Sequence, residues 1–361
     1  MKILPNTEAP ARQPKTAVIF GGTGFIGLHF ARYLMADAGF THIVLADTKP
    51  PTAHAAHKFI LPHLQTGAVR YVACDVRYAV DAAAVSGGLP VDFIANFAAV
   101  HREPGHAPHE YFETNLPGAH TVCAFAEAVG CADVLFTSSI SPYGPSEVPR
   151  TEASIPTPET AYGSSKLAAE LIHAAWRDRG GAGDAKEGAR RLLVVRPGVV
   201  FGPGEGGNVS RMVALLSQRG FFVFAGNEQT RKAGIYVKEL CRAMWWLHEH
   251  AALSPPGVVT ANMTMNPAPA MKDYVDAVQR VAGKKAFVPS IPAWLLIAAA
   301  RGIQTLAALV GRQTGVNVVR VRKLIRSNNI VPGVLMAQQY PYQFTLDAAL
   351  ADWRQDMPEE W

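Results

Sequence analysis

Six short apolar runs between residues 16 and 197 alternate with helical patterns, and this alternation constrains the fold more than any other feature. The runs lie at 16–20, 41–47, 69–75, 91–99, 132–139 and 191–197, and the helical stretches at 24–38, 77–86, 108–129 and 161–178. Strands that are apolar throughout are typical of a sheet covered on both faces, and helical crossovers make neighbouring strands parallel. The pattern therefore predicts an α/β fold with a doubly wound parallel sheet.

A glycine-rich loop joins the first apolar run to the first helical stretch. The string FGGTGFIG contains Gly21, Gly24 and Gly27, and glycine there lets backbone N–H groups approach a pyrophosphate at a helix N-terminus. Asp47 ends the second run 20 residues after Gly27, where a carboxylate accepts hydrogen bonds from ribose hydroxyls and repels a 2′-phosphate. The two features predict a Rossmann-type site for NAD rather than NADP. The alternative is a tight turn that binds no nucleotide.

The ends of the third and fourth runs extend this predicted cofactor site. Asp75 is expected near the adenine, although it could equally cap the helix at 77–86. The small Ala98 and Ala99 would let a cofactor lie close to the backbone, or they serve only tight packing. The predicted cofactor-binding residues of these segments are Gly21, Thr23, Gly24, Phe25, Ile26, Gly27, Asp47, Asp75, Val76, Phe97, Ala98 and Ala99.

The regular alternation stops after residue 197, which indicates a second, smaller and mostly helical domain. Helical patterns follow at about 208–219 and 237–250. An apolar run near 257–263 comes next, and further helical patterns follow it. We expect a flexible leader, an NAD-binding domain with a returning segment, and a substrate-binding domain in two pieces. Their predicted ranges are 1–15 for the leader, 16–200 with 234–265 for the NAD-binding domain, and 201–233 with 266–361 for the substrate-binding domain.

Composition adds mainly exclusions. The formal charge of +5 suits anionic small molecules and gives no argument for nucleic acid. The four cysteines lack metal-type spacing, so we expect reduced core thiols, no metal site and a cytoplasmic protein. The N-terminal residues contain no apolar segment of the kind found in secretory signals.

Tyr162 and Lys166 lie four residues apart in a helical pattern, on one helix face. A cationic ammonium beside a phenol favours the phenolate, so the pair suits a general base, but two surface residues would have the same spacing. Ser138 and Ser139 end the fifth run, at the carboxyl edge where doubly wound sheets bind ligands. The next helix would bring Tyr162 and Lys166 to that same edge.

Taken in order, these strings resemble the extended short-chain dehydrogenase/reductases, within the NAD-dependent epimerase/dehydratase group that acts on nucleotide sugars. The strings are GGTGFIG, NFAAVH, ETNLPGAHTV, TSSISPYG, YGSSK, RPGVVFGPGE and QTRKAGIYVKEL. They cover about residues 16 to 265, and the resemblance continues more weakly to the C-terminus. It implies NAD as cofactor, a nucleotide sugar as substrate and a homodimer formed through the helices near 108–129 and 161–178.

The resemblance also implies roles for individual residues. Tyr162 would be the general acid and base, and Lys166 would hold the nicotinamide ribose and lower the pKa of the tyrosine. Ser139 would hydrogen-bond the reacting oxygen, and Pro197 would lie beside the nicotinamide carboxamide. Asn115 is usually structural in this family or part of a proton relay. Hydride leaves a carbon only as its hydroxyl loses a proton, so base and nicotinamide must meet at one carbon.

The type of reaction is inferred from two acidic residues that this chain lacks. Family members that dehydrate sugars have an Asp-Glu pair where this chain has Ile140 and Ser141, so we discount dehydration. A C4 epimerase of a nucleotide sugar needs only the Ser, Tyr and Lys set, and Asp47 favours it by favouring NAD. The alternatives are a 4-keto reductase and a hydroxysteroid-type dehydrogenase. A cofactor-sensing regulator of the same fold would tend to lack the Tyr/Lys pair.

The predicted substrate-binding residues are Ser139, Ser141, Asn208, Arg231 and His101. Arg231 resembles a family arginine that holds the substrate diphosphate, but its spacing to Val237 is one residue too long and Lys232 has the usual spacing. Asn208 would bind phosphate or sugar, or cap a helix. His101 lies in the loop after the fourth strand, which would face the sugar site. The favoured interpretation is that His101 is a solvated loop residue without a role in binding.

The segment 291–312 is unusually apolar, with Arg301 near its middle. The central arginine argues against a membrane-spanning helix. A helix in the membrane surface is the second interpretation, and a core or oligomer-contact helix is favoured. The basic residues Arg320, Arg322, Lys323 and Arg326 follow it.

Overall fold

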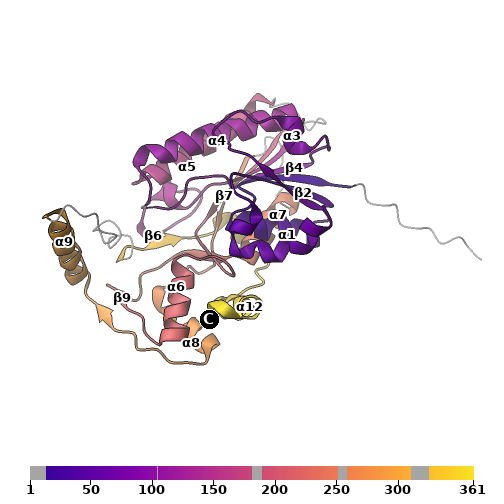
Figure 1. Cartoon of the computed structure of the whole chain (residues 1–361). Coiled ribbons are helices and arrows are strands. Elements are labelled where there is room, and N and C mark those ends of the chain that lie inside the picture. Colours follow the sequence, from indigo (N-terminus) through magenta and orange to yellow (C-terminus); the bar gives the residue numbers. More distant parts are fainter. Residues whose placement is uncertain (1–13, 104, 181–188, 251–257, 310–324) are drawn as a thin grey trace, which may run out of the picture.

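The computed structural model describes residues 14–103, 105–180, 189–250, 258–309 and 325–361, and a parallel seven-stranded sheet forms its centre (Figure 1). The strand order is β11-β7-β5-β4-β1-β2-β3, and every pair of neighbours is parallel. The strands are β1 (Thr16–Phe20), β2 (His42–Asp47), β3 (Val69–Ala73), β4 (Phe93–Asn96), β5 (Asp133–Thr137), β7 (Arg191–Pro197) and β11 (Val258–Met263). This topology confirms the predicted doubly wound α/β fold.

The two faces of the sheet bury separate cores. Alternate residues of a strand point to opposite faces, and Ala17 and Ile19 of β1 join one core while Val18 and Phe20 join the other. The first core includes α1 (Phe25–Ala36) and α7 (Val237–His250), and the second includes α4 (Pro108–Ala128) and α5 (Ala161–Arg179). In Figure 1, α4 and α5 lie above the sheet and α1 and α7 lie below it.

The segment after β3 differs from the predicted helix at 77–86. Helix α3 covers only Ala82–Ser86 because Asp81, not Asp75, caps it by accepting hydrogen bonds from the backbone N–H groups of Ala83 and Ala84. The segment between β2 and β3, for which no helix was predicted, contains η1 (Pro51–Ala53), η2 (Ala55–Ile60) and α2 (Leu61–Gln65).

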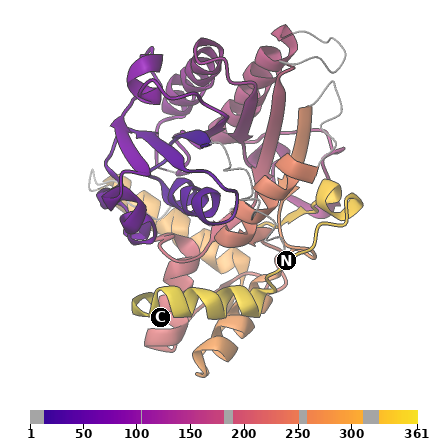
Figure 2. The same cartoon turned by 90° about the vertical axis from the view of Figure 1, so that its right-hand side faces the viewer.

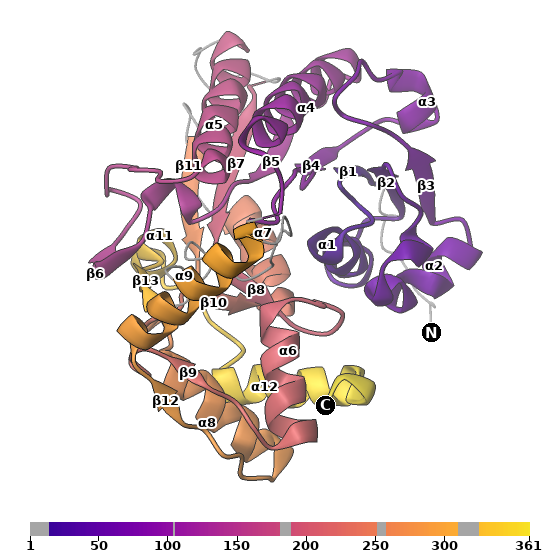
Figure 3. The same cartoon turned by 60° about the vertical axis from the view of Figure 1, so that its left-hand side comes forward.

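Most elements from beyond residue 197 lie below the sheet (Figures 2 and 3). The helices in this part of the chain are α6 (Asn208–Ala214), α8 (Met271–Ala282), α9 (Ala293–Leu309), α11 (Gly333–Ala337) and α12 (Leu346–Asp356), and a π-helical turn (Leu215–Arg219) follows α6. Two-stranded parallel ladders join β8 (Val199–Phe201) to β10 (Gly234–Tyr236), β9 (Phe224–Ala225) to β12 (Ser290–Ile291) and β6 (Ser146–Arg150) to β13 (Asn328–Ile330). The predicted division into leader and two domains stays a prediction, and leader residues 1–13 lie outside the described residues.

Helix α9 exposes most of its apolar side chains. Trp294, Leu295 and Ile303 are exposed, and among its residues with described side chains only Ala300 is buried. A core position for the segment 291–312 is therefore wrong over the described part, and an oligomer contact is untested. Arg320, Arg322 and Lys323 lie outside the described residues. In the part of the chain that the structure describes, no helix has both the length and the hydropathy needed to cross a membrane.

Candidate functional site

The glycine-rich loop is shaped by close approaches of backbone to backbone. Gly21 has φ +70, and a Cβ there would lie 2.5 Å from the nitrogen of Ala98. A Cβ on Gly27 would lie 2.6 Å from the oxygen of Gly21. Gly24 is different, because its Cβ would meet only the Gly21 oxygen at 3.3 Å. Gly24 is also the N-cap of α1 and offers no side-chain cap, so the first N–H groups of α1 stay open to an anion.

Asp47 at the end of β2 contacts this loop directly. Its Oδ2 accepts a hydrogen bond from the backbone N–H of Thr23 at 3.2 Å, and its Oδ1 accepts one from Thr48 at 2.7 Å. The Thr23 hydroxyl donates to the carbonyl of Lys49 at 3.0 Å. Loop and carboxylate are thus held together as one unit. Phe25 and Ile26 follow on the first turn of α1, both partly buried.

Asp75 is occupied by a neighbouring arginine. Arg77 donates to both carboxylate oxygens, with Nη2 2.6 Å from Oδ2. This hydrogen bonding lowers the pKa of Asp75. The alternative role of Asp75 as a helix cap is wrong, and a role near the adenine stays a prediction. Val76 is buried against Gly118 of α4, where a Cβ would lie 3.0 Å from the valine Cγ2.

Asn115 on α4 fixes the loop that follows β4. Its Oδ1 accepts from the N–H of Val100 at 2.9 Å, and its Nδ2 donates to the Val100 carbonyl at 3.2 Å and to Ser165 Oγ at 2.9 Å. Ser165 in turn donates to the carbonyl of Tyr162 at 2.9 Å. The amide therefore ties the loop to α5, which agrees with a structural role. Phe97, Ala98 and Ala99 are partly buried at the start of this loop.

Ser139, Ser141 and Tyr162 meet beyond the end of β5. Ser139 Oγ donates to Ser141 Oγ at 3.1 Å and accepts from the Ser141 N–H at 3.1 Å. The side chains of Ser139 and Tyr162 are in contact. Burial raises the pKa of Tyr162 to about 12, and the contact with Ser139 offsets part of that rise. In the protein alone the tyrosine pKa is therefore raised, whereas the family resemblance implies that Lys166 lowers it.

Lys166 lies one turn further along α5 and is fully enclosed. Its Nζ lies 4.3 Å from the centroid of the Phe136 ring, whose other neighbour is the stacked ring of His173 at 4.1 Å. Burial lowers the pKa of Lys166 to about 7, and Glu170 opposes that shift. Burial in the protein alone therefore disfavours the charged form of this lysine.

A buried polar network that the sequence analysis missed lies behind these residues. Glu170 accepts from Ser138 Oγ at 2.5 Å and pairs with Arg196, whose Nε lies 2.8 Å from Glu170 Oε1. Arg196 also donates to the Tyr143 hydroxyl at 2.7 Å, which donates to Asn262 at 2.9 Å. The only signal in the sequence was the spacing of four residues between Lys166 and Glu170.

This network connects the neighbours of the predicted site residues. Ser138 precedes Ser139, and Arg196 precedes Pro197, which is buried at the end of β7. The Pro197 carbonyl accepts from the Ile140 N–H at 3.1 Å, so β5 and β7 end side by side. One ion pair thus links the strand ends that carry Ser139 and Pro197 to the helix that carries Tyr162.

Three further predicted substrate-binding residues are exposed. Asn208 is exposed and accepts from Arg211 Nη2 at 2.6 Å, while Gly207 is the N-cap of α6, so the alternative role of Asn208 as a cap is wrong. Arg231 is exposed and donates to the Ala268 carbonyl at 2.6 Å. Lys232 donates to the Arg326 carbonyl at 2.6 Å, and burial lowers its pKa to about 8. His101 is exposed.

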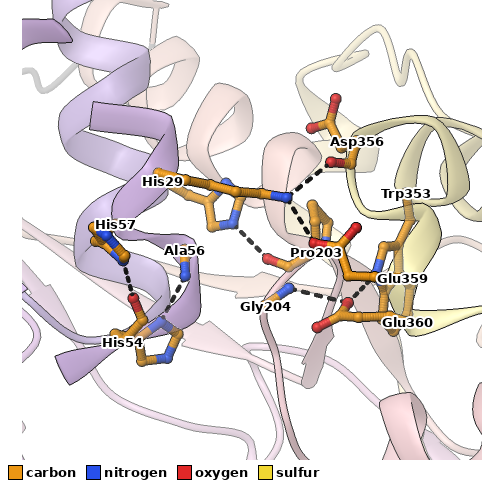
Figure 4. A network of polar contacts seen from close by, with 11 residues as sticks. His29, His54, Ala56, His57, Pro203, Gly204, Trp353, Asp356, Glu359 and Glu360 are labelled. Carbon is orange, nitrogen blue, oxygen red and sulfur yellow. Dashed lines mark hydrogen bonds and ion pairs between the residues drawn. The ribbon is translucent and has the colours of Figure 1, made fainter. Parts of the chain in front are cut away.

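The C-terminus holds the loop that leads to Asn208 (Figure 4). Glu360 Oε2 accepts from the Gly204 N–H at 3.2 Å and from Trp353 Nε1 at 2.6 Å. His29 Nε2 donates to the Pro203 carbonyl at 2.9 Å, and burial lowers the pKa of this imidazole to about 3, so it is neutral. The loop after β8 is therefore fixed both by α1 and by the last residues of the chain.

Comparisons with known proteins agree on one family. The family described as NAD dependent epimerase/dehydratase matches residues 17–261. N-acetyl-alpha-D-glucosaminyl-diphospho-ditrans,octacis-undecaprenol 4-epimerase of Escherichia coli O157:H7 is 25% identical over 72% of this chain and 75% of its own length. UDP-glucose 4-epimerase of Lacticaseibacillus casei is 32% identical, but over 44% of this chain and 45% of its own length.

Solved structures show the same fold. The UDP-glucuronic acid 4-epimerase of Bacillus cereus, in complex with UDP-glucuronic acid and NAD, gives a TM-score of 0.72 at 14% identity and covers 96% of this chain and 100% of its own. A UDP-galactose 4-epimerase gives 0.67 at 20% identity over 96% of this chain and 100% of its own. With the family match spanning well over half of the sequence, this chain belongs to the NAD-dependent epimerase/dehydratase family.

Proposed function

We propose that this protein is an NAD-dependent 4-epimerase that acts on a sugar joined to a diphosphate, first of all a nucleotide sugar such as a UDP-sugar. The observation that carries the proposal is the side-chain contact between Ser139 and Tyr162 at the carboxyl edge of the sheet, with Lys166 one turn away. The relatives named above are 4-epimerases, which supports the same reaction. The lack of an acid at Ile140 and Ser141 speaks against dehydration.

The residues of the chain fit NAD. The open N-terminus of α1 with its three glycines suits the pyrophosphate, and Asp47 suits the ribose hydroxyls of the adenosine half. Bound there, NAD would supply a hydride acceptor that returns the hydride to the opposite face of the sugar ring. We propose that Ser141 and His101 lie on the sugar side, and Asn208 and Arg231 on the diphosphate side.

Side chains of the protein would carry out the proton transfer. In this proposal the Tyr162 oxygen takes the proton of the C4 hydroxyl and later returns it, while Ser139 hydrogen-bonds the same oxygen of the sugar. The pKa of Tyr162, raised to about 12 by burial, opposes this step in the protein alone. A protonated Lys166 and the positive charge of the oxidised nicotinamide would both lower that pKa.

Replacing Tyr162 by phenylalanine tests the proposal. Tyr162→Phe removes the proton acceptor, so we expect the turnover of UDP-sugars to fall at least about a hundred-fold. The measurement is product formation by NMR or chromatography, together with the NAD content of the purified protein, which should not change. Tyr33→Phe, at a partly buried tyrosine on α1, is the matched control and should keep full activity. Equal rates for Tyr162→Phe and wild type would rule out the proposed mechanism.

The fate of the cofactor separates the alternatives. An epimerase keeps its NAD through many turnovers and needs none added, whereas a 4-keto reductase or a hydroxysteroid-type dehydrogenase consumes NADH or NADPH in proportion to product.

A second candidate substrate is a sugar on a polyprenyl diphosphate, as the name of the E. coli relative states for that protein. The exposed apolar helix α9 favours this candidate, because a soluble nucleotide sugar requires no such helix.

The assembly proposed from the family resemblance is a homodimer through α4 and α5. These two helices pack side by side on one face of the sheet, as Figure 3 shows. Leu171 on α5 is 66% exposed and Phe112 on α4 is also exposed, which supports an apolar contact there. We also propose that the segments 201–233 and 266–361 bind the substrate.

A further inference from the structure

Helix α9 presents an apolar surface that the rest of the described chain does not cover. Trp294 is 70% exposed, Leu295 45% and Ile303 43%, and Ala298 and Ala299 between them are exposed as well. These positions follow spacings of three and four residues, so they form one stripe along the helix. An exposed tryptophan within such a stripe is unusual on a protein that meets only water.

The sequence around α9 carries an equally unusual charge. From residue 277 to residue 346 the chain contains no Asp or Glu, although the whole protein has 29 of them in 361 residues. The same stretch contains nine basic residues, namely Arg280, Lys284, Lys285, Arg301, Arg312, Arg320, Arg322, Lys323 and Arg326. With a formal charge of only +5 on the whole chain, the remainder of the protein is net negative.

This combination fits an anionic membrane surface better than a second copy of the chain. Two copies meeting at α9 would bring two acid-free, positively charged segments together, which costs electrostatic energy. An anionic bilayer attracts each nearby Lys or Arg by about 1 kcal/mol and accepts the ring of a tryptophan at its interface. Because α9 lacks the length and hydropathy to span a bilayer, it suits a position in the plane of the surface.

The start of α9 adjoins the segment proposed to hold the diphosphate. The carbonyl of Ile291 accepts from the Gly226 N–H at 2.9 Å, where β12 pairs with β9. A Cβ on Gly226 would lie 3.6 Å from the Cβ of Ala293, the first residue of α9. Arg231 follows five residues after Gly226 in the same segment. A surface that held α9 would therefore lie next to the proposed diphosphate side of the site.

We propose that α9 is a membrane-surface anchor that lies in the interface of an anionic phospholipid bilayer. Trp294, Leu295 and Ile303 enter the boundary between headgroups and acyl chains, and the net positive charge of the acid-free segment attracts the lipid phosphates. The protein thereby works at a membrane with its substrate side held against the lipid. This inference concerns location, and it stands or falls separately from the proposed reaction.

Vesicle flotation tests the anchor. The full-length protein is mixed with vesicles of phosphatidylcholine containing about 30% phosphatidylglycerol, or with phosphatidylcholine alone. We expect binding to the anionic vesicles that weakens with added salt, and at least ten-fold weaker binding to the neutral ones. The triple variant W294S/L295S/I303S should lose at least ten-fold in binding. The control V148S/I155S changes two apolar residues on another segment that are 66% and 78% exposed, and it should bind like the wild type.

Two further measurements keep the test decisive. Trp294 is the most exposed tryptophan of the chain, so brominated lipids should quench the fluorescence of the wild type and not that of Trp294→Phe. This readout stands even if the triple variant fails to fold. Tyr162→Phe should bind the anionic vesicles as the wild type does, so a failed reaction and a failed anchor give different results. Equal binding to both kinds of vesicle, no binding, or a triple variant that changes only the oligomeric state would overturn the proposal.

Discussion

The glycines of the loop after β1 show how single residues divide structural and binding roles. Gly21 and Gly27 leave no room for a side chain, because the backbone itself lies within 2.5 to 2.8 Å of the missing Cβ. Gly24 has only one atom near its Cβ position, at 3.3 Å, and its φ of −74 suits any residue. The protein alone therefore explains two of the three glycines, and the third is explained by a ligand that approaches the N-terminus of α1.

Alanine at Gly24 and at Gly27 should therefore give different phenotypes. Gly27→Ala forces a Cβ against the Gly21 oxygen and the Gly22 Cα, so we expect a loss of about 1–3 kcal/mol in unfolding free energy. Gly24→Ala should cost about 1 kcal/mol or less, as expected for alanine at an N-cap, and should still deplete the NAD that copurifies. Thermal melts and the NAD content of both variants are the measurements. A Gly24→Ala protein that retains its NAD would contradict the assigned role of the loop.

Residue spacing predicted which groups meet at the site, but not their protonation. The i, i+4 spacing of Tyr162 and Lys166 correctly placed both on α5. Their pKa values depend on burial by residues far away in sequence, such as Phe136 under the lysine, and no local pattern reveals that. Asn208 was similarly ambiguous, because an Asn beside a helix start can stand at the cap or just inside it.

At the scale of elements, the buried pair of Glu170 and Arg196 joins α5 to β7. Both side chains are almost completely enclosed, and Glu170 also accepts from Ser138 at the end of β5. Breaking such a pair by removing one partner leaves an uncompensated buried charge, which costs more than replacing both. The pair therefore maintains the relative positions of the strand ends and of the helix that carries Tyr162.

The stability of this pair can be measured by a double-mutant cycle. Arg196→Met should lower the unfolding free energy by about 3–5 kcal/mol, since it leaves Glu170 charged and unpaired. The double variant Glu170→Met/Arg196→Met should be more stable than Arg196→Met alone, because it leaves neither partner of the pair buried without the other. Urea unfolding of the three variants and the wild type gives the coupling energy. Strictly additive effects would show that the two side chains act independently.

Elements with a clear period were predictable, and those set by a local contact were not. The apolar strands and the long helices α1, α4, α5 and α7 lie where the sequence indicates. The helix expected from residue 77 begins only at Ala82, because Asp75 bonds Arg77 and Asp81 supplies the cap. The two- and three-residue strands β8 to β10 and β12 are too short to show any period.

On the scale of the whole molecule, elements from the second half of the chain pack against the first half. β11 pairs with β7 at the edge of the main sheet, and α7 packs against α1, although both come from beyond residue 230. Both elements lie within the segment 234–265, which the sequence analysis expects to return to the NAD-binding domain. The contacts of the last residues with the nucleotide-binding side could not be predicted at all, because they join groups more than 150 residues apart.

Two neighbouring glutamates at the C-terminus make a matched pair for testing that contact. Glu360 accepts from the Gly204 N–H and from Trp353 (Figure 4), whereas Glu359 pairs with the partly exposed Lys58 at 2.9 Å. Exposed ion pairs contribute about 0–1 kcal/mol, so Glu359→Ala should leave both melting temperature and kinetics nearly unchanged.

Glu360→Ala removes the acceptor that two inward-facing N–H groups share, so we expect a loss of about 1–3 kcal/mol in stability. The freed loop after β8 leads directly to Asn208, so KM for the diphosphate sugar should rise more than kcat falls. Melting curves and steady-state kinetics of both variants check this. If Glu360→Ala and Glu359→Ala behaved alike, the C-terminus would be a passive end of the chain, and the loop would owe its position to His29 and Pro203 alone.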